Sequence, residues 1–344
     1  MALFKALRLA FYILFLAAII GGYYVYVQAS TKPLSNRTQT LEVPAGAGIA
    51  WLASKLENQG IIDNRYIFRI FALINYKDAT IKAGEYNLVD VSNTAELVEK
   101  LVAGRVIQYS ITLIEGKAFK DVKALLISQE GLEDKIESMT DAQIMRDLGA
   151  PGVHPEGQFA PQTYFYTKGD SDFDVLQQAF DQQQAVLKAA WQSRSPDTRV
   201  STEYELLILA SIIEKETGQA SEREEIAGVF TNRLRIGMKL QTDPTVIYGM
   251  GDAYKGNIRR KDLTTDTEYN TYTRFGLPPT PIAMPGEAAI RAAANPASTE
   301  ALYFVGKGDG THKFSRTLKE HNAAVVKYQL GGRPQSFSSN PDTQ

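Results

Sequence analysis

The segment TEYELLILASIIEKETG, residues 202–218, contains a run of eight residues, 206–213, that are nearly all apolar. Apolar residues at almost every position, rather than along one stripe, predict a helix that is buried on all sides. Thr202 and Glu205 have the spacing of a capping box, which marks a helix start, and Gly218 is a typical helix end. The sequence therefore predicts a buried helix between these residues.

Two glutamates stand near the end of this helix, at positions 214 and 216. Residues two apart point about 200° apart around a helix, so Glu214 and Glu216 cannot serve one site as a close pair. Burial and the negative end of the helix dipole both raise a carboxyl pKa. A glutamate that stays protonated near neutral pH is suited to be a general acid. The alternative is that both are solvated residues at a helix end, and periodicity does not separate the two interpretations.

The segments that follow contain a second helix and two polar stretches. Ser221 and Glu224 have the spacing of another capping box, and Gly237 is placed to end that helix. MKLQTDPTVIYGMG (238–251) and EYNTYTRFGLPPTPIAMPG (268–286) are dense in Gln, Asp, Asn, Tyr and Pro. We expect stiff loops whose side chains stack on sugar rings and hydrogen-bond hydroxyls and amides. The alternative, a proline-rich surface without function, does not explain the run of residues 269–272.

The N-terminus predicts a membrane anchor. Residues 9–28 are uncharged and follow Lys5 and Arg8, and about 20 apolar residues suffice for a helix to cross a bilayer. A cleaved signal peptide is the alternative, with Val27-Gln28-Ala29 as the cleavage site, but its apolar core is usually only about 7–15 residues. Basic residues before the span predict that residues 1–8 are cytoplasmic and that the chain after the span lies across the membrane.

A polar linker, residues 29–40, leads to a strand–turn–helix plan that occurs twice, in 41–62 and 111–132, with Gly46 and Gly116 at matching positions. This is either a duplicated unit or a coincidence. Between the copies, residues 65–74 and 93–104 predict helices and 82–89 a strand, and Asn93 begins an N-x-x-E cap with Glu96. Residues 41–108 thus form a predicted βααβ module of a kind that commonly binds ligands.

The rest of the chain contains an irregular stretch, a predicted helix and a polar tail. Residues 154–167, HPEGQFAPQTYFYT, are too irregular for the interior of an element. Residues 172–193 predict a long helix, and the polar tail 332–344 is predicted to be disordered.

The composition excludes several classes of protein and site. A net charge of -2 argues against a nucleic-acid partner. The chain has no cysteine, which excludes disulfides and thiolate chemistry. Its three histidines lack the spacing of a zinc motif, so we expect no metal, and His312 and His321 are expected to form structural hydrogen bonds or to line a cleft.

Six ordered stretches together resemble the endolytic murein transglycosylases, the MltG or YceG-like family of the bacterial inner membrane. They are EGQFAPQTY (156–164), LASIIEKETG (209–218), VFTNRLRIGMKLQTDPTVIYG (229–249), YNTYTRFGLPPTPIAMPG (269–286), LYFV (302–305), and HKF with HN near 312 and 321. One departure is Gln162, where the family usually has an acidic residue, and this puts any charge-dependent role of that position in doubt.

The resemblance implies an α+β architecture. It consists of a single N-terminal transmembrane helix, a LysM-like glycan-binding module at 41–108 and a mixed α/β catalytic domain at 109–331. It also implies cleavage of the MurNAc-β-1,4-GlcNAc bond within peptidoglycan strands, which leaves 1,6-anhydro-MurNAc ends and needs no cofactor. The family's essential glutamate corresponds to Glu216. The enzyme is then expected in the inner membrane with its catalytic domain in the periplasm, near peptidoglycan synthases, where it would end new strands.

One glutamate suffices for this chemistry. The sugar's own C6 hydroxyl attacks C1, and an intramolecular nucleophile has a high effective molarity. Glu216 would protonate the leaving oxygen and then accept the C6 proton. Glu214 is expected to be structural, paired with Arg223 or Arg233. The side chains expected to hold the glycan and its N-acetyl groups are Gln241, Asp243, Tyr248, Asn270, Tyr272 and Asn322.

Two other functions remain open at this stage. One is a non-catalytic, membrane-tethered peptidoglycan-binding protein, which would use the same aromatic loops without needing a perturbed glutamate. The other is a muramidase-type hydrolase that forms reducing ends, which needs a second carboxylate across the cleft, and Asp243 is the candidate.

Overall fold

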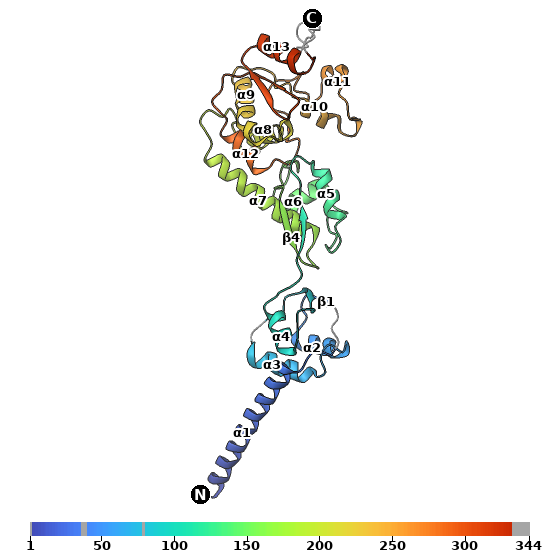
Figure 1. Cartoon of the computed structure of the whole chain (residues 1–344), viewed down its shortest axis with the longest axis vertical. Helices are drawn as coiled ribbons and strands as arrows, with labels where there is room; N and C mark the ends of the chain where they lie inside the picture. The colour runs from blue at the N-terminus through green and yellow to red at the C-terminus, as the bar shows by residue number, and fades with distance from the viewer. Residues whose placement is uncertain (1, 36–39, 78–79, 332–344) are drawn as a thin grey trace. The chain divides into compact units, whose positions relative to one another are not determined.

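A computed structural model describes residues 2–35, 40–77 and 80–331 of the chain (Figure 1). The tail predicted to be disordered, 332–344, and part of the predicted linker lie outside the described residues. The chain divides into two compact units. The N-terminal unit extends to Ser110 and includes Glu130–Glu133 and Phe165–Asp170, and the C-terminal unit contains the remainder. The architecture is a mixed α+β one, as expected.

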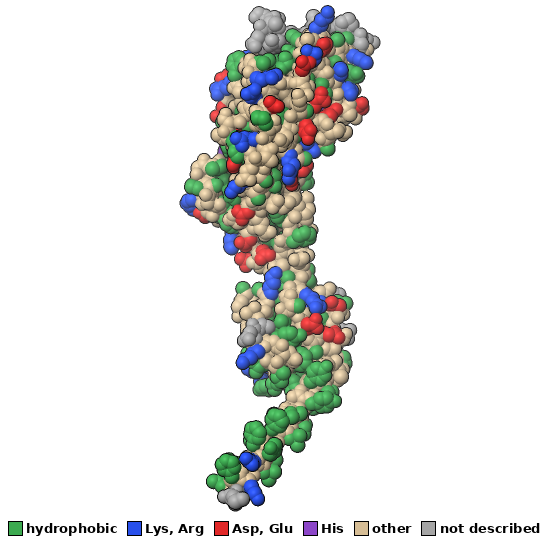
Figure 2. Space-filling view, turned by 90° about the vertical axis from the view of Figure 1, so that its left-hand side faces the viewer, with side chains coloured by type: hydrophobic (Ala, Val, Ile, Leu, Met, Phe, Trp, Pro, Cys, Tyr) green, Lys and Arg blue, Asp and Glu red, His purple; other side chains and the backbone are tan. Residues whose placement is uncertain are grey.

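Helix α1 (Ala2–Thr31) opens the N-terminal unit. Residues Leu3–Thr31 have a mean hydropathy of 2.1, and among the described residues this is the one helix long and apolar enough to cross a membrane. Hydrophobic side chains cover most of its visible face, and basic side chains lie near its N-terminal end (Figure 2). The helix extends beyond the predicted span at both ends. At its C-terminal end, Val25 and Ala29 are buried in the core of the unit, and their packing continues the helix into the predicted linker.

The rest of the N-terminal unit has the predicted order of elements. β1 (Thr40–Val43) is followed by α2 (Ile49–Asn58), α3 (Arg65–Asn75), β2 (Gly84–Asn87) and α4 (Thr94–Val102). β1 and β2 pair antiparallel, with buried Leu41 opposite buried Tyr86. The predicted cap is confirmed, since the Asn93 side chain accepts the backbone N–H of Glu96 at 3.0 Å.

The two predicted strand–turn–helix segments share their local structure. β1 leads through Gly46, at φ +76°, into α2. β3 (Tyr109–Thr112) leads through Gly116, at φ +72°, into α5 (Phe119–Ile127). Glycine takes this left-handed conformation without the strain that a Cβ would bring. The similar plan seen in the sequence is therefore a similarity of conformation.

β3 pairs with β4 (Thr163–Tyr166) in a two-stranded sheet. The prediction that residues 154–167 contain no regular element is wrong for these four residues. Tyr164 and Tyr166 alternate with the exposed Thr163 and Phe165, which is the period of a strand with one buried face.

The C-terminal unit is mainly helical, and Figure 1 shows its longer helices gathered around α8. In chain order its helices after α5 are α6 (Asp141–Asp147), α7 (Asp172–Gln192), α8 (Glu203–Glu216), the 3₁₀ turn η1 (Ala220–Glu222), α9 (Arg223–Arg235), α10 (Asp243–Met250), the 3₁₀ turn η2 (Gly251–Ala253), α11 (Arg260–Thr264) and α12 (Glu287–Ala294). A hairpin of β5 (Tyr303–Gly306) and β6 (His312–Ser315) and helix α13 (Leu318–Tyr328) complete the unit.

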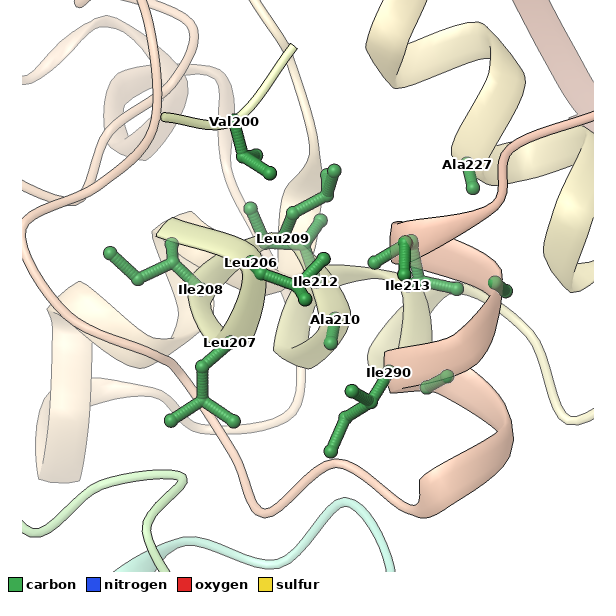
Figure 3. Packing of buried hydrophobic residues seen from close by; sticks show 14 of the residues in the cluster. Val200, Leu206, Leu207, Ile208, Leu209, Ala210, Ile212, Ile213, Ala227 and Ile290 are labelled. Carbon is green, nitrogen blue, oxygen red and sulfur yellow. The ribbon is translucent and has the colours of Figure 1, made fainter. Parts of the chain in front are cut away.

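Helix α8 is the centre of this unit. Every residue from Leu206 to Ile213 is buried, as the sequence predicted, and the helix packs against α7, α9, α10 and α12. Figure 3 shows Leu207, Ile212 and Ile213 leaving α8 in different directions, with Ile290 beside them and Ala227 nearby. Because it is held on all sides, the helix is a rigid support for whatever its last turn carries.

Two local predictions after α8 are wrong. Ser221 does not cap α9, because the chain first makes the turn η1 and the helix begins at Arg223 without a side-chain cap. Residues 243–250 form helix α10 instead of a loop, since Pro244 lies in the first turn, where a helix tolerates proline. The predicted end of α9 is confirmed, with Gly237 at φ +66° just beyond it. Helix α8 ends at Glu216 on an extended Thr217, slightly before the predicted Gly218.

Candidate functional site

Glu216 lies in the last turn of α8 and faces a cavity of about 540 Å³ within the C-terminal unit. The walls come from parts of the chain that are distant in sequence, namely the connection from α9 to α10, the loop at Tyr272, the β5–β6 hairpin and α13. Four residues predicted from the sequence as site residues line this cavity. They are Glu216, Gln241, Asp243 and Tyr272.

The environment of Glu216 favours its protonated form. The side chain keeps a little surface toward the cavity but is otherwise surrounded by protein, and burial raises its pKa to about 7. A hydrogen bond donated by the Thr242 hydroxyl to Oε1 of Glu216 opposes this shift. The negative charge of Asp243 raises the pKa further, whereas His312 and Arg233 lower it. Glu216 can therefore both release and accept a proton near neutral pH.

Thr242 is fixed by a small network of threonines. Its backbone N–H donates to Oγ1 of Thr271 at 3.1 Å, and its carbonyl accepts the hydroxyl of Thr245 at 2.8 Å. The hydroxyls of Thr245 and Thr271 lie 2.9 Å apart. The adjacent Gln241 has φ +46°, a left-handed conformation that is uncommon for a residue with a Cβ. The backbone beside Glu216 is thus held in one conformation by several buried contacts.

Asp243 and Tyr272 form a second polar pair in the cavity. The Tyr272 hydroxyl donates to Oδ1 of Asp243 at 2.5 Å. Burial raises the pKa of Tyr272, and the charge of Asp243 adds to this effect, so the phenol stays neutral and remains a donor. One oxygen of the Asp243 carboxylate therefore already accepts a hydrogen bond from the protein.

Arg233 was not predicted as a site residue, although it lies in the stretch 229–249. It is buried, and its Nε and Nη1 donate to the carbonyls of Leu302 at 2.7 Å and Leu240 at 2.6 Å. Its guanidinium lies 5.4 Å from the ring centroid of Tyr303. Arg233 thus ties β5 and the start of the 241–243 segment to α9 while placing a positive charge near Glu216. Thr242 and Tyr303 were missed as well, and no spacing pattern in the sequence marks them.

Both histidines expected to form structural hydrogen bonds or to line a cleft face the cavity. Nδ1 and the backbone N–H of His312 lie 2.7 and 2.9 Å from the carboxylate of Glu222, which fixes the ring. His321 stacks on Tyr303 with ring centroids 5.2 Å apart. These contacts build the wall of the cavity that faces α8.

The structure places the other three predicted residues outside the lining of the cavity. Tyr248 donates to the buried Glu156 at 2.9 Å. Asn270 is buried, donates to the carbonyls of Asp262, Leu263 and Thr265 at the end of α11 (Arg260–Thr264), and accepts the N–H of Tyr272 at 2.9 Å. Asn322 lies on α13 and is partly buried. Asn270 therefore acts on the cavity through the loop that carries Tyr272.

Glu214, on another side of α8, has surroundings unlike those of Glu216. Its Oε2 accepts the N–H of Gly286 at 3.1 Å, and Oε1 lies 3.9 Å from Nη2 of Arg223. Of the two partners expected from the sequence, the structure thus selects Arg223. Glu214 holds the start of α12 against α8, as a structural residue would.

Glu156 is the second carboxyl group that burial strongly affects. Burial raises its pKa to about 7, and its oxygens accept the Tyr248 hydroxyl and the N–H of Phe119, both at 2.9 Å. It therefore caps α5 and links it to α10. Within residues 2–35, 40–77 and 80–331, no cluster of three or more His, Asp or Glu side chains is arranged to hold a metal ion.

Comparison with known proteins extends these observations. The model of the YceG-like family matches residues 41–327. A Bacillus subtilis protein named endolytic murein transglycosylase is 33% identical over 331 residues, covering 90% of this chain and 91% of its own. A Streptococcus pneumoniae protein with the same name is 26% identical, and the match covers 94% of this chain and 65% of that longer protein. The crystal structure of a YceG-like protein from Listeria monocytogenes is 31% identical, with a TM-score of 0.53 over 82% of this chain and 97% of its own.

Proposed function

Because this chain belongs to the YceG-like family, we propose that it is a peptidoglycan lytic transglycosylase, the activity for which its Bacillus subtilis and Streptococcus pneumoniae relatives are named. One observation carries the proposal for this chain. Glu216 stands at the end of a rigid, buried helix, faces a cavity large enough for sugar units, and has a pKa of about 7. An enzyme that must give and then take one proton needs such a group.

The reaction would proceed with Glu216 as its single acid and base. Protonated Glu216 gives its proton to the oxygen that links C1 of MurNAc to the next sugar, and the C1–O bond breaks. The C6 hydroxyl of the same MurNAc forms a new bond to C1, and the Glu216 carboxylate accepts the C6 proton. The products are a 1,6-anhydro-MurNAc end and a free GlcNAc end, and Glu216 returns to its starting state. No water is consumed, so the second carboxylate of an ordinary glycosidase is not required.

The polar residues beside Glu216 would orient the sugar. Gln241, Asp243 and Tyr272 line the same cavity, and the Tyr272–Asp243 pair presents a fixed acceptor surface to sugar hydroxyls or N-acetyl groups. Arg233 and His312 would limit how far the pKa of Glu216 rises. We assign direct contact with the glycan to these cavity residues. We assign Asn270 the role of supporting the loop that carries Tyr272, because its side-chain amide is fully engaged in hydrogen bonds with backbone groups.

The finer part of the proposal concerns location and biological role. Helix α1 would anchor the protein in the inner membrane, with residues 1–8 in the cytoplasm and the chain after the helix in the periplasm. The β1–α2–α3–β2 segment would be a LysM-like module that holds the glycan strand. Cleavage within strands, close to the peptidoglycan synthases, would end the elongation of new strands.

The proposal is tested by mass spectrometry of purified peptidoglycan after digestion by the full chain in detergent. We expect anhydro-ended fragments, which are lighter by one water than reducing-end fragments, from the wild type and none from Glu216→Gln. Reducing-end fragments would instead identify a hydrolase and direct attention to Asp243. Binding of peptidoglycan without cleavage by the wild type would identify a tethered binding protein.

A further inference from the structure

Helix α3 presents an apolar face to solvent. Tyr66, Ile70, Leu73 and Ile74 are 55%, 43%, 59% and 62% exposed. Their spacing of four, three and one residues places them on one side of the helix. The opposite side, with Phe68, Phe71 and Ala72, packs into the core of the N-terminal unit. The exposed face is therefore additional to what the fold needs, and contiguous exposed apolar surface commonly marks a binding surface.

The charges on and beside this face are basic. α3 contains no Asp or Glu, Arg69 is exposed beside this face, and Lys77 is exposed two residues beyond the end of the helix. Arg65 forms an ion pair with Glu57, with Nε 3.6 Å from Oε2, and the two charges balance each other. The remaining positive charge of this region comes from Arg69 and Lys77. Aliphatic and aromatic side chains flanked by Arg and Lys are typical of helices that lie in the headgroup layer of a membrane. An anionic lipid surface attracts basic residues that lie close to it.

The position of α3 is fixed relative to α1. Val25 and Ala29 are buried in the same core as Phe68 and Phe71, and the ring of Tyr26 stacks on Phe71 with centroids 6.4 Å apart. Figure 1 shows α3 next to the end of α1, whereas β1 lies across the unit from it. When the apolar length of α1 occupies a bilayer, α3 consequently lies at the level where that helix leaves it.

We propose that the exposed face of α3 inserts into the headgroup layer of an anionic phospholipid bilayer, so that the N-terminal unit lies on the membrane surface beside its anchor. This inference rests on the membrane anchoring by α1 proposed above. A lone transmembrane helix leaves a domain free to tilt and rotate, whereas a second apolar contact restricts it. α3 would thus set the orientation in which the module meets the glycan.

The test uses fluorescent labels on the full chain in liposomes of anionic and neutral phospholipids. Because the chain has no cysteine, single cysteines can be introduced and labelled with an environment-sensitive fluorophore. Leu73→Cys and Ile70→Cys report the exposed face of α3, and both sites are exposed, so the core is undisturbed. Leu16→Cys reports the span of α1. Glu42→Cys, exposed on β1, reports the side of the unit away from α3. Lipids with brominated acyl chains serve as the quencher.

We expect the labels at positions 16, 70 and 73 to lose most of their emission to the brominated lipids, and the label at 42 to keep its emission. Quenching at 16 without quenching at 70 and 73 would overturn the inference while leaving the anchor intact. No quenching at 16 would mean that the anchor itself is absent. If emission at 70 and 73 changes with the protein-to-lipid ratio and not with bromination, the face binds a second copy of the chain, which would also overturn the inference.

Discussion

The hydroxyl of Thr242 donates a hydrogen bond to Oε1 of Glu216 and so joins the segment before α10 to the last turn of α8. A bond donated to a carboxylate stabilises its charged form, whereas burial stabilises its protonated form. At Glu216 burial is the larger effect, and the pKa is raised to about 7. Changes around this pair should therefore shift the pH dependence of activity in directions that can be stated in advance.

Thr242→Val removes the donor and should raise the pKa of Glu216 further. The first step needs protonated Glu216, so activity falls as the pH rises through its pKa, and this fall should move to higher pH in the variant. A hydrogen bond to a charged group contributes about 1.5 kcal/mol or more, which corresponds to a shift of about 1 pH unit. The rate of anhydro-end formation between pH 5 and 9 measures it. Thr242→Ser keeps a hydroxyl and should leave the profile unchanged; an equal shift in both variants would contradict the assignment.

Asp243→Asn should shift the same profile in the opposite direction. The charge of Asp243 raises the pKa of Glu216, so its loss lowers that pKa, and activity should fall at a lower pH than in the wild type. Asparagine still offers an oxygen to the Tyr272 hydroxyl, so the pair at 2.5 Å is kept. Products analysed by mass should remain anhydro-ended at a reduced rate. If the variant cleaved no peptidoglycan at any pH, so that no pH profile of its activity could be measured, the result would show that Asp243 takes part in the chemistry itself.

Glu216→Gln should stabilise the fold at alkaline pH. The folded pKa of about 7 lies above the ordinary value of 4.5, so the folded state binds the proton more tightly than the unfolded state. The free energy of unfolding of the wild type therefore decreases as the pH rises from 4.5 to 7 and stays reduced above that, by about 3 kcal/mol at most.

Glutamine does not ionise and avoids this cost. The thermal midpoint of Glu216→Gln should exceed that of the wild type at pH 8 and match it near pH 4.5. Glu203→Gln, at an exposed site at the start of the same helix, should change neither value. A Glu216→Gln protein less stable than the wild type at pH 8 would show that the carboxylate is not held at an energetic cost.

Gly228→Ala should destabilise the C-terminal unit. A Cβ at Gly228 on α9 would lie 2.6 Å from the carbonyl oxygen of Ala297 and 2.7 Å from Cγ2 of Thr299. Backbone must move to admit it, at a cost of about 1–3 kcal/mol that outweighs the better helix propensity of alanine. Gly218→Ala is the matched control, since no atom lies within 4 Å of its Cβ. Urea unfolding of both variants compares them, and equal midpoints would contradict the predicted clash.

The sequence predicted the parts of this protein whose cause is local. Neighbouring residues are enough to predict four features. These are the apolar run of α8, the Asn93 cap, the turns at Gly46 and Gly116, and the order of helices and strands in the N-terminal unit. The predicted S/T-x-x-E box at Thr202 is confirmed in its first half, since Thr202 accepts the N–H of Glu205. The Glu205 carboxylate instead accepts the N–H of Ser201, one residue earlier.

The failed predictions at Ser221 and in the cavity wall have distant causes, whereas the one at α10 has a local cause. The carboxylate of Glu222, next to Ser221, accepts the backbone N–H of His312, which lies 90 residues further along the chain. The turn η1 places Glu222 where it can make this contact. The sequence predicts a loop at α10 because its proline and its glycine are also typical of loops. Arg233 and Tyr303 come together in the cavity wall because α9 packs against β5. No pattern within a single segment of the sequence predicts that contact.

The burial of α8 on every side has a consequence for how this protein can change over evolutionary time. Deleting one residue within the helix would place Thr217 where Glu216 now stands, and inserting one would place Lys215 there, so the Glu216 side chain would turn by about 100° from its present direction. The segment at Thr242 is tied to the same turn of α8 by its hydrogen bond to Glu216. The chemistry proposed for Glu216 would therefore be inherited with the register of a single helix, together with the segment that is hydrogen-bonded to its last turn.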